Sequence, residues 1–469
     1  MIRTFALVLS IGLLSACQSV AESPQQSERP EVAQRPNIIV ILADDMGWGD
    51  IGLNGASLMK TPNIDRIGRE GVQLTQFYAG ANVCTPSRAA LLTGRYPIRS
   101  GMQHVIFPHT QIGMPPEEVT IAEVLKGAGY ATGMVGKWHL GHHDEYWPTN
   151  QGFDYFYGVP YSNDMQPFDL YAHKTVVQSP ADQKALTDNY TDAATGFIRE
   201  HAEEPFFLYF AQTFPHVPLF VPDDEAGVSR AGLYGDVVEH LDDGIGAILD
   251  TLDELDLAGD TLIIVTSDNG PWFEGDQGDH RDRKGGTHEG SYLVPFLARW
   301  PDVIAPGTTS DAMAMNIDLL PTLAAVAGTQ MPGDRVIDGR DILPLMEGAG
   351  TSPHDVLYFF NGNDIAAIRD ERFRLVLNTY YRDFYVPFEA FGTKLLFDLE
   401  TDPEERFSFV REHPDVVERL MDKVTAMRAE TDELKKPPLP TRPPEGEAVD
   451  IGPVLTPDSD ASDEASAPQ

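Results

Sequence analysis

The sequence predicts an α/β protein: a large mixed, mostly parallel sheet sandwiched by helices, with a smaller C-terminal α+β subdomain. Short continuous apolar runs, typical of strands buried on both faces, alternate along the chain with amphipathic helical patterns. This alternation favours a sheet that helices cover on both faces. After about Pro353 the pattern changes to shorter, more aromatic strands and one late helix near 414–431, which predicts the subdomain.

The elements of the main domain follow from local patterns. Buried strands are expected at 37–42, 131–135, 206–210 and 261–265. Thr120 and Glu123 have the spacing of a capping box, which predicts a helix that starts there and runs to Gly129. A long amphipathic helix is expected over 234–255, because apolar residues recur on one of its faces. This face contains Val237, Val238, Leu241, Ile245, Ile248 and Leu249.

The N-terminal segment is typical of an exported protein. Residues 1–17 combine a cationic start, an apolar stretch too short to span a bilayer and small residues before Cys17. They resemble a bacterial lipoprotein signal, in which Cys17 carries the lipid, and a plain secretory signal with an unrelated cysteine is the alternative. Because Gln18 follows instead of Asp, we expect a protein of the periplasm or cell surface, held as an outer-membrane lipoprotein.

Composition also predicts the domain boundaries of this 469-residue chain. Both ends are rich in Pro, Ser, Glu and other polar residues, which is typical of segments that bury no core. The expected regions are a signal peptide at 1–17, a flexible tether at 18–35, a catalytic domain at 36–352, the α+β subdomain at 353–436 and a disordered acidic tail at 437–469.

The charge of the chain excludes one class of partner. It has 72 acidic and 34 basic residues, with a formal net charge of −38. Nucleic-acid binding needs a basic surface, so we expect no nucleic-acid partner. The acidity itself is typical of a solvated surface. An anionic substrate would therefore need local positive charge at its site.

Polar residues follow each of the four predicted strands. Asp44 and Asp45 come after the first strand, Lys137 and His139 after the second, His216 after the third, and Asp268 and Asn269 after the fourth. Alone, the Asp44 pair and the Asp268 pair would each be interpreted as an ordinary turn, and His216 as a structural histidine. In open α/β sheets, however, ligands bind beyond the carboxyl ends of the strands, so four such groups predict one shared site.

The residue types in this predicted site indicate its chemistry. The oxygen donors of Asp44, Asp45, Asp268 and Asn269 favour Ca²⁺ or Mg²⁺ over zinc. The donors and cations suited to an anionic group are Lys137, His139, His216, Arg88 and Lys284.

Cys84 lies just before a helical stretch predicted at 87–92. The start of a helix favours an anion, so an unmodified Cys84 could be a cysteine nucleophile with a low pKa. A cysteine hydrolase, however, would have little need for a cation site with three carboxylates.

Six segments in order along the chain resemble those of the type I, formylglycine-dependent sulfatases, an arylsulfatase-like family of the alkaline-phosphatase-like superfamily. They are Ala43–Asp50, Cys84–Arg95, Gly136–Gly141, Pro215–Pro218, Ser267–Gly270 and Lys284–Gly290. The resemblance covers roughly Pro36 to Thr431. One departure is Leu293, where many relatives carry arginine before Val-Pro. That change concerns packing or substrate preference, and not the core chemistry.

The resemblance implies a nucleophile and a metal shell. Cys84 would be converted to formylglycine, an aldehyde whose hydrated gem-diol attacks sulfur and which also faces the metal. Asp44, Asp45, Asp268 and Asn269 would complete the shell of a Ca²⁺ ion, with Mg²⁺ as the alternative.

The resemblance also implies roles for the cations and histidines. Arg88 would neutralise and orient the formylglycine, and Lys137 and Lys284 would hold sulfate oxygens. His139 would assist the formylglycine hydroxyl, and His216 would protonate the leaving oxygen.

The function implied is a sulfatase that hydrolyses sulfate monoesters after a maturation enzyme has modified Cys84 in the cytoplasm. The expected location at the cell surface favours sulfated saccharides as substrates, and hence sulfated polysaccharide degradation. Residues that could contact sugar hydroxyls are His104, His109, His142, His143, Tyr161 and Asp164. The alternatives are a phosphodiesterase or phosphonate monoester hydrolase of the same superfamily, and a non-catalytic glycan-binding lipoprotein.

Overall fold

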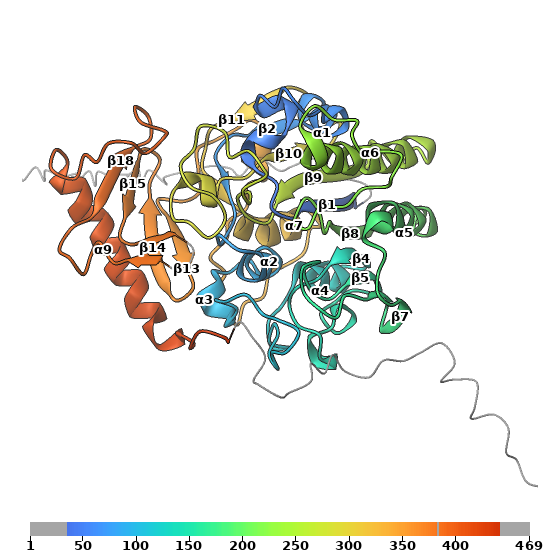
Figure 1. Cartoon of the computed structure of the whole chain (residues 1–469), viewed down its shortest axis with the longest axis horizontal. Coiled ribbons are helices and arrows are strands. Elements are labelled where there is room, and N and C mark those ends of the chain that lie inside the picture. Colours follow the sequence, from blue (N-terminus) through green and yellow to red (C-terminus); the bar gives the residue numbers. More distant parts are fainter. Residues whose placement is uncertain (1–34, 382–383, 441–469) are drawn as a thin grey trace, which may run out of the picture. The chain divides into compact units, whose positions relative to one another are not determined.

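A computed structural model describes residues 35–381 and 384–440 (Figure 1). The predicted signal peptide, the tether up to residue 34 and the tail beyond residue 440 lie outside the described residues. Within the described part of the chain, no helix is both long enough and apolar enough to cross a membrane.

The core of the molecule is a ten-stranded mixed sheet, mostly parallel at its centre. The neighbours β9, β1, β8, β4 and β5 run parallel, and antiparallel strands join at both sides. In spatial order the strands are β11 (Thr308–Ser310), β2 (Val72–Leu74), β10 (Phe296–Arg299), β9 (Thr261–Ser267), β1 (Asn37–Ala43), β8 (Phe206–Ala211), β4 (Ala131–Lys137), β5 (Tyr155–Val159), β6 (Leu170–Ala172) and β7 (Thr175–Gln178).

Helices cover both faces of this sheet, as predicted (Figure 1). Alternate residues of the fully buried β1 enter two different hydrophobic cores, with Ile38 in one and Ile39 in the other. The first core includes side chains of α2 (Cys84–Thr93), α4 (Ile121–Gly127), α7 (Leu319–Val326) and α8 (Leu343–Met346). The second includes side chains of α1 (Pro62–Arg69), α5 (Leu186–Glu200) and α6 (Gly232–Glu254).

Local sequence signals explain the boundaries of several elements. Thr120 Oγ1 accepts a hydrogen bond from the Glu123 N–H at 3.1 Å, and Glu123 Oε2 accepts one from the Thr120 N–H at 2.8 Å, so the predicted capping box is confirmed. The four predicted strands and the long helix are present, and the strands extend further towards their carboxyl ends. The boundaries of two short helices differ from the prediction. α2 begins at Cys84 and not at residue 87, because Pro86 is compatible with a first helical turn, and α4 ends at Gly127, two residues before the predicted Gly129.

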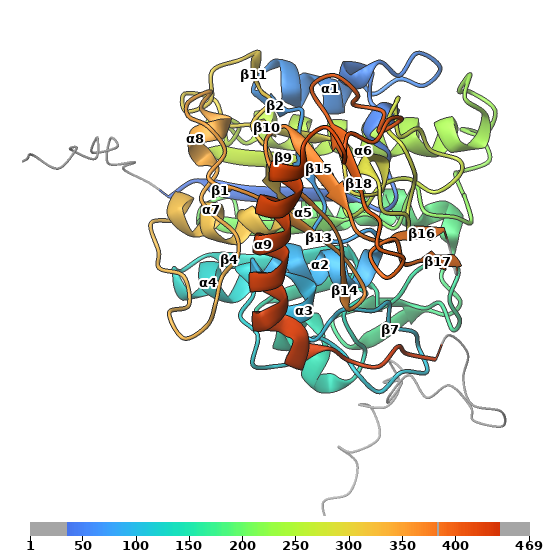
Figure 2. The same cartoon turned by 90° about the vertical axis from the view of Figure 1, so that its left-hand side faces the viewer.

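The C-terminal subdomain contains a four-stranded antiparallel sheet (Figure 2). Its strands, in spatial order, are β13 (Leu357–Asn361), β14 (Asp364–Arg369), β15 (Phe373–Val376) and β18 (Leu395–Asp398). The predicted late helix is α9 (Pro414–Thr431), which packs against β14 and β15. Smaller elements are α3 (Pro97–Ser100), the pair β3 (Phe77–Tyr78) and β12 (Ala314–Met315), and the hairpin β16 (Thr379–Tyr381) and β17 (Phe384–Val386).

A buried ionic network joins this subdomain to the segment that follows Lys284. Arg374, fully buried in β15, donates hydrogen bonds to Glu289 Oε1 at 2.8 Å and to the Thr287 carbonyl at 2.6 Å. Leu293, the departure noted above, is buried in the apolar cluster beside this network. The subdomain therefore helps to hold the segment that carries Lys284.

Candidate active site

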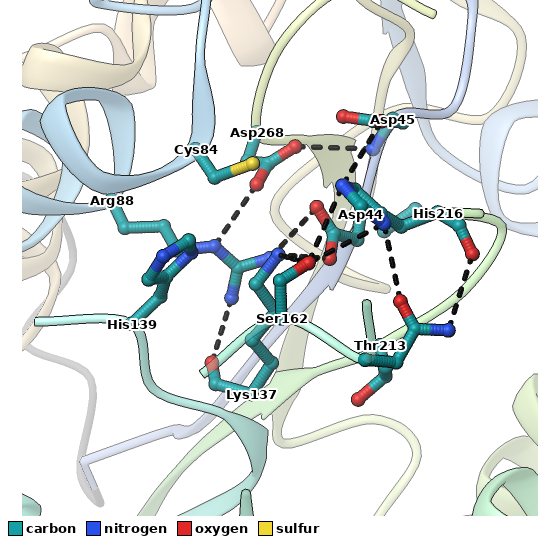
Figure 3. Close-up of polar contacts among 12 residues, drawn as sticks. Asp44, Asp45, Cys84, Arg88, Lys137, His139, Ser162, Thr213, His216 and Asp268 are labelled. Atoms are coloured by element: carbon teal, nitrogen blue, oxygen red, sulfur yellow. Dashed lines mark hydrogen bonds and ion pairs between the residues drawn. The ribbon is translucent and has the colours of Figure 1, made fainter. Parts of the chain in front are cut away.

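The parallel strands bring the predicted site residues together at their carboxyl ends (Figure 3). β9, β1, β8 and β4 are consecutive neighbours, so the polar residues that follow them meet at one edge. Helix α2 adds Cys84 at its first position and Arg88 one turn later. Lys284 comes from the loop after β9, and its Nζ lies 3.1 Å from Cys84 Sγ.

The carboxylates form two groups of potential metal ligands that share Cys84. Asp44, Cys84 and Asp268 make one group, and Asp45, Cys84 and His216 make the other, with ligand atoms within 4.8 Å of one another. The buried Oδ1 atoms of Asp44 and Asn269 accept no hydrogen bond from the described residues. Buried oxygens normally have partners, so these two atoms and their carboxylate neighbours fit a hard divalent cation.

Arg88 is a fully buried cation that connects these groups to the sheet. Its Nε donates to Asp268 Oδ2 at 2.9 Å, its Nη1 donates to the Lys137 carbonyl at 2.7 Å, and its Nη2 lies 3.5 Å from Asp44 Oδ1. Burial and the negative charge of Asp44 together raise the pKa of Asp268 to about 7, against the opposing effect of Arg88. The negative charge of these carboxylates thus exceeds the positive charge that Arg88 supplies.

Lys137 lies on the opposite side of Asp44. Its Nζ donates to Asp44 Oδ2 at 2.5 Å and to Ser162 Oγ at 3.1 Å. Although burial would raise the pKa of Asp44, Lys137 and Arg88 hold it well below its usual value. No sequence signal pointed to Ser162, because β5 (Tyr155–Val159), the strand that precedes it, is short and contains Gly158.

Lys284 is held from two directions. Its Nζ lies 2.9 and 2.7 Å from the two oxygens of Asp45, and its own N–H donates to the Pro271 carbonyl at 3.0 Å. Asn82 binds the two residues that follow Lys284. Its carbonyl accepts a hydrogen bond from the Gly285 N–H at 2.9 Å, and its Nδ2 donates one to the Gly286 carbonyl at 2.6 Å. Sequence patterns gave no signal for Asn82.

The unmodified thiol of Cys84 is a poor nucleophile in these surroundings. Burial raises the pKa of Cys84 to about 12, and the charges of Lys137 and Lys284 only partly offset this effect. Because the thiolate is the reactive form of cysteine, the thiol would stay protonated at neutral pH. The arrangement does not favour the cysteine nucleophile considered from the sequence.

His139 has one free ring nitrogen. Its Nε2 lies 3.1 Å from the Ile106 carbonyl, so Nε2 carries the hydrogen, and Nδ1 has no partner among the described residues. Burial, with the charges of Lys137 and Arg88, holds the pKa of His139 well below its usual value. A neutral imidazole with an unshared lone pair on Nδ1 is suited to accept a proton.

His216 lies between Asp45 and two polar side chains. Its Nε2 is 3.7 Å from Asp45 Oδ2, and its Nδ1 is 3.1 Å from Asn163 Oδ1 and 3.3 Å from Ser162 Oγ. Burial and the charge of Lys284 lower the pKa of His216, against the opposing effect of Asp45. An anion bound beside this imidazole would raise its pKa and favour the protonated form.

Two site residues have a left-handed backbone. Asp45 has φ of 67° and His139 has φ of 59°. Such conformations cost roughly 1–3 kcal/mol at residues with a side chain, and they persist where the surroundings over-determine them. The Asp45 N–H donates to Asp268 Oδ1 at 3.1 Å, and the His139 N–H donates to the Pro160 carbonyl at 3.1 Å.

The residues predicted to contact sugar hydroxyls are scattered around this centre. His104 Nε2 and His109 Nε2 lie 3.3 and 2.9 Å from the carbonyls of Lys436 and Pro440, at the end of the described chain. The Tyr161 hydroxyl contacts His142 Nδ1, and Tyr161 is buried. Asp164 is exposed, and the ring of His143 lies 4.3 Å from that of His142.

The fold and this site define a hydrolase of the alkaline-phosphatase-like class. The sequence model of the Sulfatase family matches residues 36–329, and the one described as N-sulphoglucosamine sulphohydrolase, C-terminal, matches residues 278–430. The chain is 37% identical to arylsulfatase A of Homo sapiens over 428 residues, covering 81% of this chain and 84% of that protein. It is 34% identical to steryl-sulfatase of Rattus norvegicus over 525 residues, covering 86% of this chain and 90% of that protein.

The chain therefore belongs to the sulfatase family and is a sulfuric ester hydrolase. Membership of this family implies a metal ion and a formylglycine residue, and the groups of potential ligands around Cys84 are consistent with both.

Solved structures confirm the fold. A Bacteroides thetaiotaomicron protein described with the metabolism of multiple glycosaminoglycans matches with a TM-score of 0.78 and 30% identity, covering 84% of this chain and 100% of that chain. The PsFucS1 sulfatase of Pseudoalteromonas sp. matches with a TM-score of 0.78 and 27% identity, covering 85% and 91%. A phosphonate monoester hydrolase of Agrobacterium radiobacter matches with a TM-score of 0.61 and 20% identity, covering 85% of this chain and 96% of that chain. At this identity the match shows a shared fold alone.

Proposed function

We propose that this protein removes sulfate from sulfated saccharides, using a formylglycine made from Cys84 beside a Ca²⁺ ion, with Mg²⁺ as the alternative. One observation carries the proposal: Cys84, buried at the first position of α2, is shared by both groups of potential metal ligands and lies 3.1 Å from Lys284 Nζ. With its pKa raised to about 12 by burial, the thiol itself is unsuited to attack. An oxygen nucleophile at this position removes that difficulty.

The metal would be held by Asp44, Asp45, Asp268 and Asn269. The three carboxylates belong to the ligand groups that share Cys84, and Asn269 Oδ1 is a buried oxygen that accepts no hydrogen bond from the described residues. When bound, the cation supplies Lewis-acid polarisation and offsets the negative charge of three carboxylates. The aldehyde, once hydrated, supplies the hydroxyl that attacks sulfur and divides a difficult hydrolysis into two easier steps.

The chain's own residues would bind the ester and move protons. Lys137 and Lys284 would hold sulfate oxygens, and Arg88 would orient the formylglycine. An anionic ester bound beside His216 would raise the pKa of this imidazole, and the protonated His216 would give its proton to the leaving oxygen. His139 Nδ1, which has no partner among the described residues, would accept a proton from the formylglycine hydroxyl.

Structural relatives support a saccharide substrate. One is described with glycosaminoglycan metabolism, and another was solved in complex with a neocarrahexaose, at 28% identity and a TM-score of 0.74. Steryl-sulfatases and arylsulfatases are also among the relatives, so sulfated saccharides have to be compared with sterol sulfates and aryl sulfates as substrates.

Two parts of the proposal concern the cell. A lipid on Cys17 would anchor the exported protein to the outer membrane, in the periplasm or at the cell surface. A maturation enzyme would modify Cys84 in the cytoplasm before export. Metabolic labelling with a lipid precursor tests the anchor, and an unlabelled, freely soluble protein would contradict it.

The function is tested by pairing an activity assay with mass spectrometry of the Cys84 peptide. We expect formylglycine, which is lighter than cysteine, and a kcat/KM for an aryl sulfate at least about tenfold above that for the matching phosphate. A higher kcat/KM for the phosphate or for a phosphonate monoester would favour the alternative hydrolases. A matured protein inactive on every ester would favour the non-catalytic glycan-binding lipoprotein.

Asn82 is expected to set the position of Lys284. In Asn82→Ala, loss of the hydrogen bond to the Gly286 carbonyl should displace Lys284 and lower kcat/KM for an aryl sulfate about tenfold. The control is Asn361→Ala, whose Nδ2 reaches the Gly285 carbonyl at the longer distance of 3.4 Å and which should change activity little. Formylglycine content must be equal in both variants, and an unaltered kcat/KM in Asn82→Ala would refute the positioning role.

A further inference from the structure

A small pocket adjoins the catalytic centre through Lys284. Its volume is about 230 Å³. The residues that line it include Trp272, Phe273, Gln277, Arg283, Lys284 and Tyr380. Because Lys284 Nζ also lies 3.1 Å from Cys84 Sγ, a group in this pocket is next to the position where an ester would be cleaved.

The aromatic wall of the pocket has a defined geometry. The rings of Trp272 and Phe273 lie 4.9 Å apart and are nearly perpendicular, with an interplanar angle of 80°. Arg283 fixes the backbone beneath them, since its Nη1 donates to the carbonyls of Trp272 at 2.8 Å and Gly275 at 2.5 Å. The wall is therefore built into the segment that also carries Lys284.

The second aromatic side comes from the C-terminal subdomain. The Tyr380 N–H donates to Thr287 Oγ1 at 3.2 Å, and the Tyr380 hydroxyl donates to Asp364 Oδ2 at 3.0 Å. The Tyr380 ring also packs on Tyr385, with centroids 4.9 Å apart. Hydrogen bonds thus hold both the backbone and the hydroxyl of Tyr380, and they fix the position of its ring in the pocket.

The polar groups of the pocket are mostly occupied by the protein. Arg283 is bound to backbone carbonyls, and Asp282 Oδ2 accepts from His288 Nδ1 at 2.6 Å. Gln277 also lines the pocket, but its Oε1 is buried and accepts no hydrogen bond from the described residues. The pocket thus offers mainly aromatic faces beside Lys284, which suits a ring that has apolar C–H faces and carries an anionic group.

We propose that this pocket binds the alcohol part of the substrate as a single pyranose ring, with a C–H face of the sugar against Trp272. This inference rests on the proposed sulfatase function and deepens it. Pockets for drug-sized ligands have about 300–1,000 Å³, so the smaller volume of this pocket suits one sugar ring better than a four-ring sterol. The substrate is then a sugar residue whose sulfate ester faces Cys84 and Lys284.

The test compares Trp272→Ala with the wild-type enzyme at equal formylglycine content. The probes are 6-O-sulfated galactose and N-acetylglucosamine, an aryl sulfate and dehydroepiandrosterone sulfate. For the better sugar, we expect KM to rise about tenfold in Trp272→Ala while kcat changes less than about threefold. Trp272→Phe keeps an aromatic face and should return KM to within about threefold of the wild type.

The matched control is Phe407→Ala, which removes an aromatic ring that is 66% exposed and does not line this pocket. It should leave KM for the sugar unchanged. An unaltered KM in Trp272→Ala, or a higher kcat/KM for the sterol sulfate than for both sugars, would overturn the inference. Wild-type turnover of the aryl sulfate but of neither sugar would overturn it and leave the sulfatase function standing. Failure on all probes would instead contradict the proposed function.

Discussion

Cys84→Ser is expected to lose turnover of an aryl sulfate by at least about 1,000-fold, when it is produced in a host whose maturation enzyme accepts only cysteine. Serine has the size and the hydroxyl to replace the thiol in its buried place at the start of α2. It lacks the second hydroxyl of a hydrated aldehyde, and a sulfate ester formed on serine would be hard to clear. The measurement is kcat, with the mass of the Cys84 peptide confirmed in the parent protein.

Two controls separate this effect from misfolding. The thermal unfolding midpoint of Cys84→Ser should stay close to that of the parent protein, since the exchange of sulfur for oxygen creates no large cavity. Cys84→Ala should be equally inactive, because it also lacks the nucleophile. Turnover by the serine variant at a rate near that of the parent would refute the formylglycine mechanism.

The central fold could be predicted because its signals are local and repeated. The run that forms β1 is apolar at consecutive positions, as a strand covered on both faces requires, and the Thr120–Glu123 capping box marks the start of α4. Two short strands at one side of the sheet could not be recognised in the same way. β11, at the edge, and its neighbour β2 have three residues each, which is too few to show the two-residue period of a strand.

The site could be predicted where its residues follow recognised strands. Asp44, His216 and Asp268 come after buried strands and Lys137 is the last residue of one, so topology alone brings them to one edge. Ser162 could not be predicted because the strand before it, β5, is short and contains Gly158. Asn82 could not be predicted because its role depends on contacts with a segment about 200 residues away. Lys284 follows no strand directly, and only the family resemblance indicated it.

Removing the metal with a chelator is expected to lower activity at least about 100-fold and to lower the thermal unfolding midpoint. Without a cation, the three carboxylates of the two ligand groups are buried, and the side chains of Arg88, Lys137 and Lys284 offset their negative charge. Burial and the charge of Asp44 raise the pKa of Asp268 to about 7, because a further negative charge is unfavourable in the metal-free site. A bound cation relieves this repulsion only in the folded state, so its binding energy adds to stability.

A neutral substitution separates the effect of losing a metal ligand from the effect of changing the net charge of the site. Asn269→Ala removes an oxygen that accepts no hydrogen bond from the described residues, without altering net charge. It should weaken Ca²⁺ binding, measured by calorimetry on the chelated protein, by at least about tenfold. Asn150→Ala, which removes an exposed amide outside the site, should bind Ca²⁺ as the parent does. Recovery of activity with Ca²⁺ but not Mg²⁺ would decide between the two ions, and a chelated protein that keeps full activity and stability would contradict the metal site.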